Sequence, residues 1–167
     1  LALRCLPKEA LDLVAGVVGT LDVIYEMMKK DGCRHIASLS MPLNCHVISR
    51  YLARVVPGLR VVDGYVFGIS PSPEKEGSWN LTQCSHSWLE SDEHDVIIDA
   101  YPVDLVAAGT VIAIPRKMPE AYHDTPYAAA GKYVECTIEE DLFDPVTSFL
   151  TVLKFHQYLK ALTAKGF

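Results

Sequence analysis

Residues 83–101 read QCSHSWLESDEHDVIIDAY, and this stretch decides the fold. Two segments, Gln83–Glu90 and Asp95–Tyr101, are strand candidates, and the second contains the apolar run Val96-Ile97-Ile98. Between them lies the polar turn Ser-Asp-Glu-His at 91–94. Apolar segments of this length on either side of a short polar turn predict two antiparallel strands joined as a hairpin.

The length of the turn determines which residues of the hairpin face one another. With a loop of residues 91–94, Glu90 pairs with Asp95 and His86 pairs with Asp99. Directly opposed side chains share one face of the sheet with Cβ atoms ~5 Å apart, within reach of an imidazole–carboxylate hydrogen bond. A loop with an odd number of residues would place the two on opposite faces. We therefore expect His86 and Asp99 to be partners.

Two helices are predicted upstream of the hairpin, because apolar residues recur there at spacings of three and four. They cover residues 9–30 and about 43–56, and Pro57-Gly58 ends the second. The predicted apolar stripe of the first consists of Leu11, Val14, Val18, Leu21, Tyr25 and Met28.

The rest of the chain adds further strands and a last helix. β-Branched and aromatic residues predict a strand at 60–69, interrupted by Asp63-Gly64. Further strands are predicted at 110–115 and 132–138, and a polar loop covers 70–80. Asp144-Pro145 opens the last helix. Its predicted buried set is Val146, Phe149, Leu150, Leu153, Tyr158, Leu159 and Leu162. Helices, then an antiparallel sheet, then a helix is an α+β arrangement, and 1–167 is expected to be a single domain.

Composition excludes several classes of partner. The chain carries a net charge of −6 with no basic run, so a nucleic-acid partner is not expected. No apolar stretch approaches the ~20 residues that span a bilayer, so no membrane association is expected. Five cysteines cannot all pair, which favours a reducing compartment and predicts a cytoplasmic protein. The first residue is Leu1, which leaves the true start of the chain and a removed signal peptide open.

Cys45 falls in the first turn of the second predicted helix, where Ser40 or Asn44 can cap the start. A thiol at this position is near the positive end of the helix dipole and near unpaired N–H groups, and both favour the thiolate. The alternative is that Cys45 is a small buried residue without chemistry, since free cysteine is among the most buried residue types.

A cysteine nucleophile needs an imidazole to hold its proton, and the imidazole needs a carboxylate to fix its tautomer. His86 and Asp99 supply these groups. Asp99 is surrounded in sequence by apolar residues, where an unpaired carboxylate is costly. The residues therefore predict a Cys45–His86–Asp99 triad. The alternative is that His86 is a core histidine whose hydrogen bonds are made elsewhere and that Asp99 is a capped or solvated aspartate of the hairpin.

Four motifs carry a family resemblance: Asn44-Cys45-His46, Val61–Val66, His86–Glu90 and Ile97–Pro102. Their order resembles the transglutaminase-like branch of the papain-like cysteine enzymes. The resemblance covers about residues 33–102. Two features depart from the usual pattern, since His46 follows the nucleophile where the family often has an aromatic or apolar residue, and no glycine precedes Cys45.

The resemblance implies a papain-like or transglutaminase-like core in which Cys45 is the nucleophile, His86 the general base and acid, and Asp99 the orienting carboxylate. It implies a hydrolase or acyltransferase, with thiol protease or amidase chemistry preferred to crosslinking. The expected substrate is a peptide or an amide-bearing small molecule, with no cofactor and no metal. The oligomeric state stays open.

Several alternatives and accessory residues stay open. The chain could be a catalytically inactive binding module of the same fold. A zinc site built from Cys33, His35, Cys45 and His46 is less favoured, because the spacings match none of the usual zinc pairs. For the oxyanion, the Cys45 N–H is the default donor. The candidates for a second donor or a pocket wall are Asn44, Gln83, Ser40, Trp79 and Trp88.

Overall fold

The computed structural model describes residues 6–32, 44–71, 79–101, 111–116, 132–135 and 145–166. Its elements in chain order are α1 (Lys8–Lys30), α2 (Cys45–Val55), β1 (Arg60–Pro71), β2 (Trp79–Ser91), β3 (Val96–Asp99), β4 (Ile112–Pro115), β5 (Lys132–Glu135) and α4 (Pro145–Ala164). Every helix and strand predicted from the sequence is present. The strand of Arg60–Pro71 runs through Asp63-Gly64 without a break, and both β1 and β2 extend into the predicted loop at 70–80.

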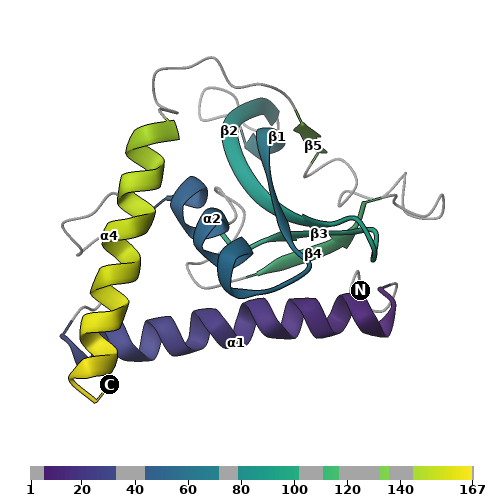
Figure 1. Cartoon of the computed structure of the whole chain (residues 1–167). Coiled ribbons are helices and arrows are strands. Elements are labelled where there is room, and N and C mark those ends of the chain that lie inside the picture. The colour runs from purple at the N-terminus through teal and green to yellow at the C-terminus, as the bar shows by residue number, and fades with distance from the viewer. Residues whose placement is uncertain are drawn as a thin grey trace.

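The strands form one antiparallel sheet, confirming the α+β class. Within the described residues the strand order is β4-β3-β2-β1-β5, and each neighbouring pair is antiparallel. β1 and β2 are long, strongly curved strands at the centre of the sheet (Figure 1). β5 adds to β1 from far along the chain, and it brings Tyr133 opposite Val66.

The hairpin between β2 and β3 has the predicted loop length, but its register is shifted. Ser91 pairs with Val96 and Glu90 pairs with Ile97, so the loop is residues 92–95. The predicted direct opposition of His86 and Asp99 is therefore wrong. Continuing the ladder places Asp99 opposite Trp88, two positions away from His86 along the strand. Because side chains alternate with a period of two, this shift leaves His86 and Asp99 on the same face.

The local geometry of the turn explains the shift. Asp95 has a positive φ of 47°, a conformation that aspartate tolerates better than most residues. Its carbonyl accepts a hydrogen bond of 2.9 Å from the N–H of Arg116, which follows β4. Asp95 therefore completes the turn rather than starting the strand.

The three helices and one face of the sheet enclose the main core (Figure 1). Leu89 and Ile98 contribute to it from the sheet. The alternate residues Trp88 and Ile97 point to the other face, where they form a second cluster with Val62 and Ile114. The sheet is thus buried on both faces around Trp88.

Helix periodicity located the helices correctly but not all their buried faces. On α1, Leu11 and Val18 are each 37% exposed, whereas Val17 and Ile24 are buried. On α4, Phe149 and Leu150 are about half exposed, and the buried positions are Thr151, Val152, Phe155, Leu159 and Leu162. Apolar residues lie on more than one side of each helix, so the spacing alone does not choose the side; the packing of α4 against α1 and α2 does.

Among the helices in the described ranges, none has the length and apolar character needed to cross a membrane.

Candidate active site

Cys45 occupies the first position of α2, as predicted. Asn44 is the N-cap, and its side-chain oxygen accepts a 3.1 Å hydrogen bond from the backbone N–H of Val47. The first N–H groups of a helix have no partner within the helix and form the positive end of its dipole, and the thiol of Cys45 is at this end. Cys45 is 6% exposed and is not in a disulfide.

His86 and Asp99 are joined despite the register shift. The Nε2 atom of His86 lies 2.8 Å from Oδ2 of Asp99, and both side chains are almost completely buried. Tyr133 also donates to Oδ2, at 2.8 Å, and the backbone N–H of Tyr101 donates to Oδ1, at 3.0 Å. A carboxylate only accepts, so Nε2 carries a proton, and Nδ1 is the nitrogen that remains for the thiol.

The proximity of Cys45 and His86 is evident in the acid–base properties of both groups. Burial lowers the pKa of His86, but the hydrogen bond and charge of Asp99, together with Cys45, raise it to about 9. The Nδ1 atom has no partner that meets hydrogen-bond geometry. Asp99 uses the Nε2 side of the ring, so Nδ1 is the nitrogen through which Cys45 and His86 act on each other's pKa.

The thiol itself is shifted towards the thiolate. Burial raises the pKa of Cys45, whereas hydrogen bonding and charge from His46 and His86 lower it to about 6. The lowering effects outweigh burial, which is opposite to the behaviour of an inert cysteine in apolar surroundings. Between about pH 6 and pH 9 the favoured state is therefore a Cys45 thiolate beside a protonated His86.

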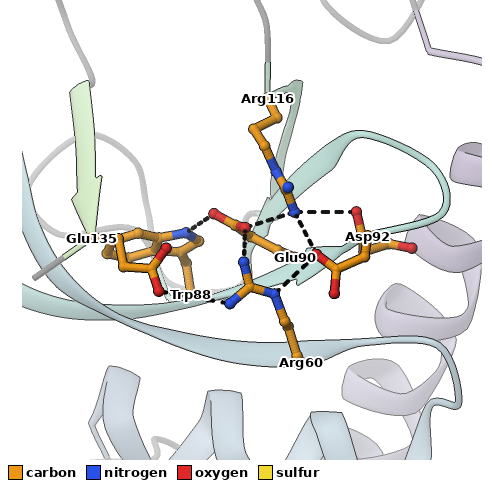
Figure 2. A network of polar contacts seen from close by, with 7 residues as sticks. Arg60, Trp88, Glu90, Asp92, Arg116 and Glu135 are labelled. Carbon is orange, nitrogen blue, oxygen red and sulfur yellow. Dashed lines mark hydrogen bonds and ion pairs between the residues drawn. The ribbon is translucent and has the colours of Figure 1, made fainter.

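Trp88, next to His86, belongs to a polar network centred on the buried Glu90 (Figure 2). The ring of Trp88 stacks on that of His86, with centroids 6.5 Å apart and planes 19° from parallel. The Nε1 of Trp88 donates to Glu90 at 2.9 Å, and the same carboxylate is bound by Arg60 at 2.8 Å and Arg116 at 2.7 Å. Because Glu90 is 5% exposed, these contacts are needed to satisfy its charge. The network fixes the orientation of Trp88 behind the imidazole.

The structure describes the side chains of some of the predicted oxyanion and pocket residues and not of others. The Asn44 oxygen is used as a helix cap, which leaves its amide nitrogen as the only donor on that side chain. Trp88 is 1% exposed and supports His86. Gln83 and Trp79 belong to β2, opposite Phe67 and Pro71, but their side chains lie outside the described residues, as does Ser40.

The zinc alternative depends mostly on residues outside the described ranges, which include Cys33 and His35. Among the side chains that are described, no three His, Cys, Asp or Glu groups gather closely enough to hold a metal ion. His46, the other zinc candidate beside Cys45, instead lies 2.5 Å from Ser87 through its Nδ1 atom.

Sequence reasoning missed two parts of the site. Tyr133 reaches Asp99 only because β5 pairs with β1, and no local pattern indicates this pairing. Asp63, Ser87 and His46 form a second hydrogen-bonded group under α2. A signal for part of it was present, because Asp63 is a charged residue directly after the apolar pair Val61-Val62, and a buried polar group needs partners.

Comparison with known proteins gives no relative: no protein-family model, curated protein or solved structure matches this chain.

Proposed function

We propose that this chain is a cysteine-dependent acyl-transfer enzyme with a papain-like, transglutaminase-like core. In this proposal Cys45 is the nucleophile, His86 the general base and acid, and Asp99 the orienting carboxylate. The observation that carries it is the buried 2.8 Å contact between Nε2 of His86 and Asp99, with Cys45 at the first position of α2. The directions of the two pKa shifts, down for the thiol and up for the imidazole, support it. A thiolate facing a protonated imidazole at neutral pH is the resting state that this chemistry requires.

The first half-reaction forms an acyl-enzyme. The thiolate attacks the carbonyl carbon of an amide, forming a C–S bond, and the carbonyl oxygen becomes an oxyanion. The backbone N–H of Cys45 is the proposed donor to this oxyanion. As the intermediate collapses, the C–N bond breaks, and the proton on Nδ1 of His86 passes to the leaving amine. His86 is then neutral, with Nε2–H still donated to Asp99.

The second half-reaction releases the acid. Neutral His86 takes a proton from water through Nδ1 while the water oxygen attacks the thioester carbon. A C–O bond forms, the C–S bond breaks, and the thiolate and the protonated imidazole are restored. If an amine replaces water, the same steps transfer the acyl group. We propose hydrolysis of a peptide or amide as the main reaction.

The test is capture of the acyl-enzyme. The protein is mixed with an activated acyl ester and then with peptide amides, and intact mass is followed by peptide mapping. We expect an acyl adduct on Cys45 in the parent, no adduct at this residue in Cys45→Ala, and acylation slowed at least about 10²-fold in His86→Ala. His94→Ala is the matched control, since His94 lies in the exposed hairpin turn.

Two results would contradict the proposal. One is the absence of an adduct on Cys45 with every acyl donor, which would favour the inactive binding module. The other is equal acylation in the His86 and His94 variants, which would mean that Cys45 reacts without an imidazole partner.

A further inference from the structure

Tyr133 contacts two residues of the site at once, although β5 lies outside the hairpin that carries His86 and Asp99. Its hydroxyl donates to Oδ2 of Asp99 at 2.8 Å. Its ring meets the ring of Trp88 edge-to-face, with centroids 5.1 Å apart. Trp88 in turn stacks on His86, whose Nε2 atom lies 2.8 Å from the same Oδ2. The four side chains therefore form a closed ring of contacts, in which polar contacts meet at Asp99 and aromatic contacts meet at Trp88.

The path from β5 to the triad crosses the sheet. Two strands, β1 and β2, separate β5 from β3, and the Tyr133 side chain extends over both to reach Asp99. Tyr133 is opposite Val66 on β1, so these two side chains share one face of the sheet. Two positions along β1 on the same face is Gly64, which is opposite His86 on β2. Glycine has no side chain, so β1 leaves space on this face next to the imidazole.

The burial of Asp99 makes its hydrogen-bond donors decisive. Asp99 is 1% exposed, so protein groups rather than bulk water must satisfy its charge. Among the described residues, the backbone N–H of Tyr101 donates to Oδ1, whereas His86 and Tyr133 both donate to Oδ2. A carboxylate only accepts, so the single proton of the Tyr133 hydroxyl is directed at Oδ2. The imidazole and the phenol therefore share one oxygen of one buried carboxylate.

Sharing one oxygen couples the Tyr133 hydrogen bond to the protonation of His86. When His86 is protonated, Asp99 is half of an ion pair and its charge is balanced. When His86 is neutral, the same carboxylate is an unbalanced buried charge, and a hydrogen bond donated to it is stronger. The Tyr133 hydroxyl therefore stabilises the state with a neutral His86 more than it stabilises the ion pair.

We propose that Tyr133 is a positioning residue of the triad, which holds the Asp99 carboxylate and limits how strongly this carboxylate stabilises the protonated imidazole. In the proposed mechanism His86 gives its Nδ1 proton to the leaving amine and later takes one from water. Asp99 alone would bias the imidazole towards keeping that proton. The Tyr133 hydroxyl reduces this bias while Asp99 keeps its orientation. This deepens the proposed function, and its importance for catalysis rests on that function.

Other groups near His86 must be separated from the effect of Tyr133. In the described part of the chain, the titratable and charged groups around this imidazole come from α2, β2, β3 and β5, and they are Cys45, Glu90, Asp99 and Tyr133. Glu90 reaches the imidazole only through Trp88, and Arg60 and Arg116 balance its charge. Cys45 acts on His86 directly by hydrogen bonding and charge. The test therefore removes the thiol, so that the imidazole titrates without it.

The experiment is an NMR titration of the His86 imidazole without substrate, in the full chain carrying Cys45→Ala. Tyr133→Phe keeps the ring against Trp88 and removes only the hydroxyl. It should raise the inflection of His86 by about half a pH unit, so that the ratio of protonated to neutral imidazole rises about threefold at a given pH. Asp99→Asn should lower the inflection instead. Tyr133→Phe added to Asp99→Asn should give little further shift, because Tyr133 acts through the carboxylate.

Tyr158→Phe is the matched control, because it removes a tyrosine hydroxyl that contacts another aspartate, Asp31, at 3.3 Å on α4. Its inflection should equal that of the Cys45→Ala parent. If Tyr133→Phe does not fold, Tyr133→Leu decides, since it also lacks the hydroxyl and should shift His86 in the same direction.

Two results would overturn the inference and leave the proposed function intact. One is an inflection of His86 that is unchanged or lowered in the folded Tyr133 variant, which a purely structural role would give. The other is an equal upward shift with and without Asp99→Asn, which would mean that Tyr133 does not act through the carboxylate. An inflection that rises as expected, in a chain whose parent forms no acyl-enzyme, would overturn the proposed function alone.

Discussion

At the scale of single residues, the site depends on how Asp99 is satisfied. Its two oxygens accept from His86, Tyr133 and the backbone of Tyr101, so its position is fixed from three directions. A carboxylate bound in this way both orients the imidazole and stabilises its protonated form. Burial lowers the pKa of His86, and the combined effects of Asp99 and Cys45 outweigh it, with the Asp99 hydrogen bond first among those that raise the pKa.

Asp99→Asn tests this directly. The amide keeps the size of the side chain but removes the charge, so the pKa of His86 should fall from about 9 towards or below its ordinary 6.5. The proposed activity requires a Cys45 thiolate, expected above about pH 6, and a protonated His86, expected below about pH 9. The alkaline limb of kcat/KM should therefore move to lower pH, with a loss of about 10²-fold or more at pH 8. An alkaline limb unmoved in the variant would show that Asp99 does not control the imidazole.

At the scale of elements, the hairpin explains why a shifted register still gave the correct pair. The observed register differs from the predicted one by two residues, so every side chain stays on its predicted face of the sheet. The 2.8 Å contact between His86 and Asp99 forms between diagonal neighbours instead of directly opposed residues. The N-cap of α2 was predictable for a similar reason, since it depends on neighbouring residues. By contrast, Tyr133 and the Ser87–Asp63–His46 group depend on contacts between distant strands or between a strand and a helix, which periodicity does not encode.

Glu90 provides a prediction at this scale, because it links β2 to Arg60 and Arg116 and accepts from Trp88. Glu90→Gln retains an acceptor for the indole N–H but loses the charge. Glu90→Leu loses both, leaving a buried donor unsatisfied, at a further cost of about 1–3 kcal/mol in the free energy of unfolding. Urea denaturation of the two variants should show this difference. Equal free energies of unfolding for Glu90→Gln and Glu90→Leu would mean that the hydrogen bond from the Trp88 indole does not contribute to stability.

At the scale of the whole molecule, α4 completes the main core by packing on α1 and α2. Phe155 is fully buried and meets Tyr51 edge-to-face, with centroids 5.1 Å apart. At the far end of α4, Lys165 and Tyr158 both contact the Asp31 carboxylate that follows α1. The sequence predicted this helix but not its orientation, because Phe149 and Phe155 are equally apolar and only the packing distinguishes them.

A pair of alanine variants tests this packing. Phe155→Ala should lower the free energy of unfolding by about 3–5 kcal/mol, because it leaves a cavity where three helices meet. Phe149→Ala should cost less than about 1 kcal/mol, since that ring is 48% exposed, with the Arg54 guanidinium stacked over it at 5.3 Å. Thermal unfolding of both variants is the measurement. A larger loss of stability in Phe149→Ala than in Phe155→Ala would mean that α4 is rotated about its own axis relative to the arrangement described.

The central claim is that Cys45 is a thiolate at neutral pH and that His86, together with His46, lowers its pKa. The most direct measurement is the rate of iodoacetamide labelling of Cys45 against pH, followed on the Cys45 peptide in the parent and in His86→Ala. We predict an inflection near pH 6 in the parent and a higher one in the variant. In both proteins, a rate that rises only above pH ~8 would be that of an ordinary thiol and would contradict the account.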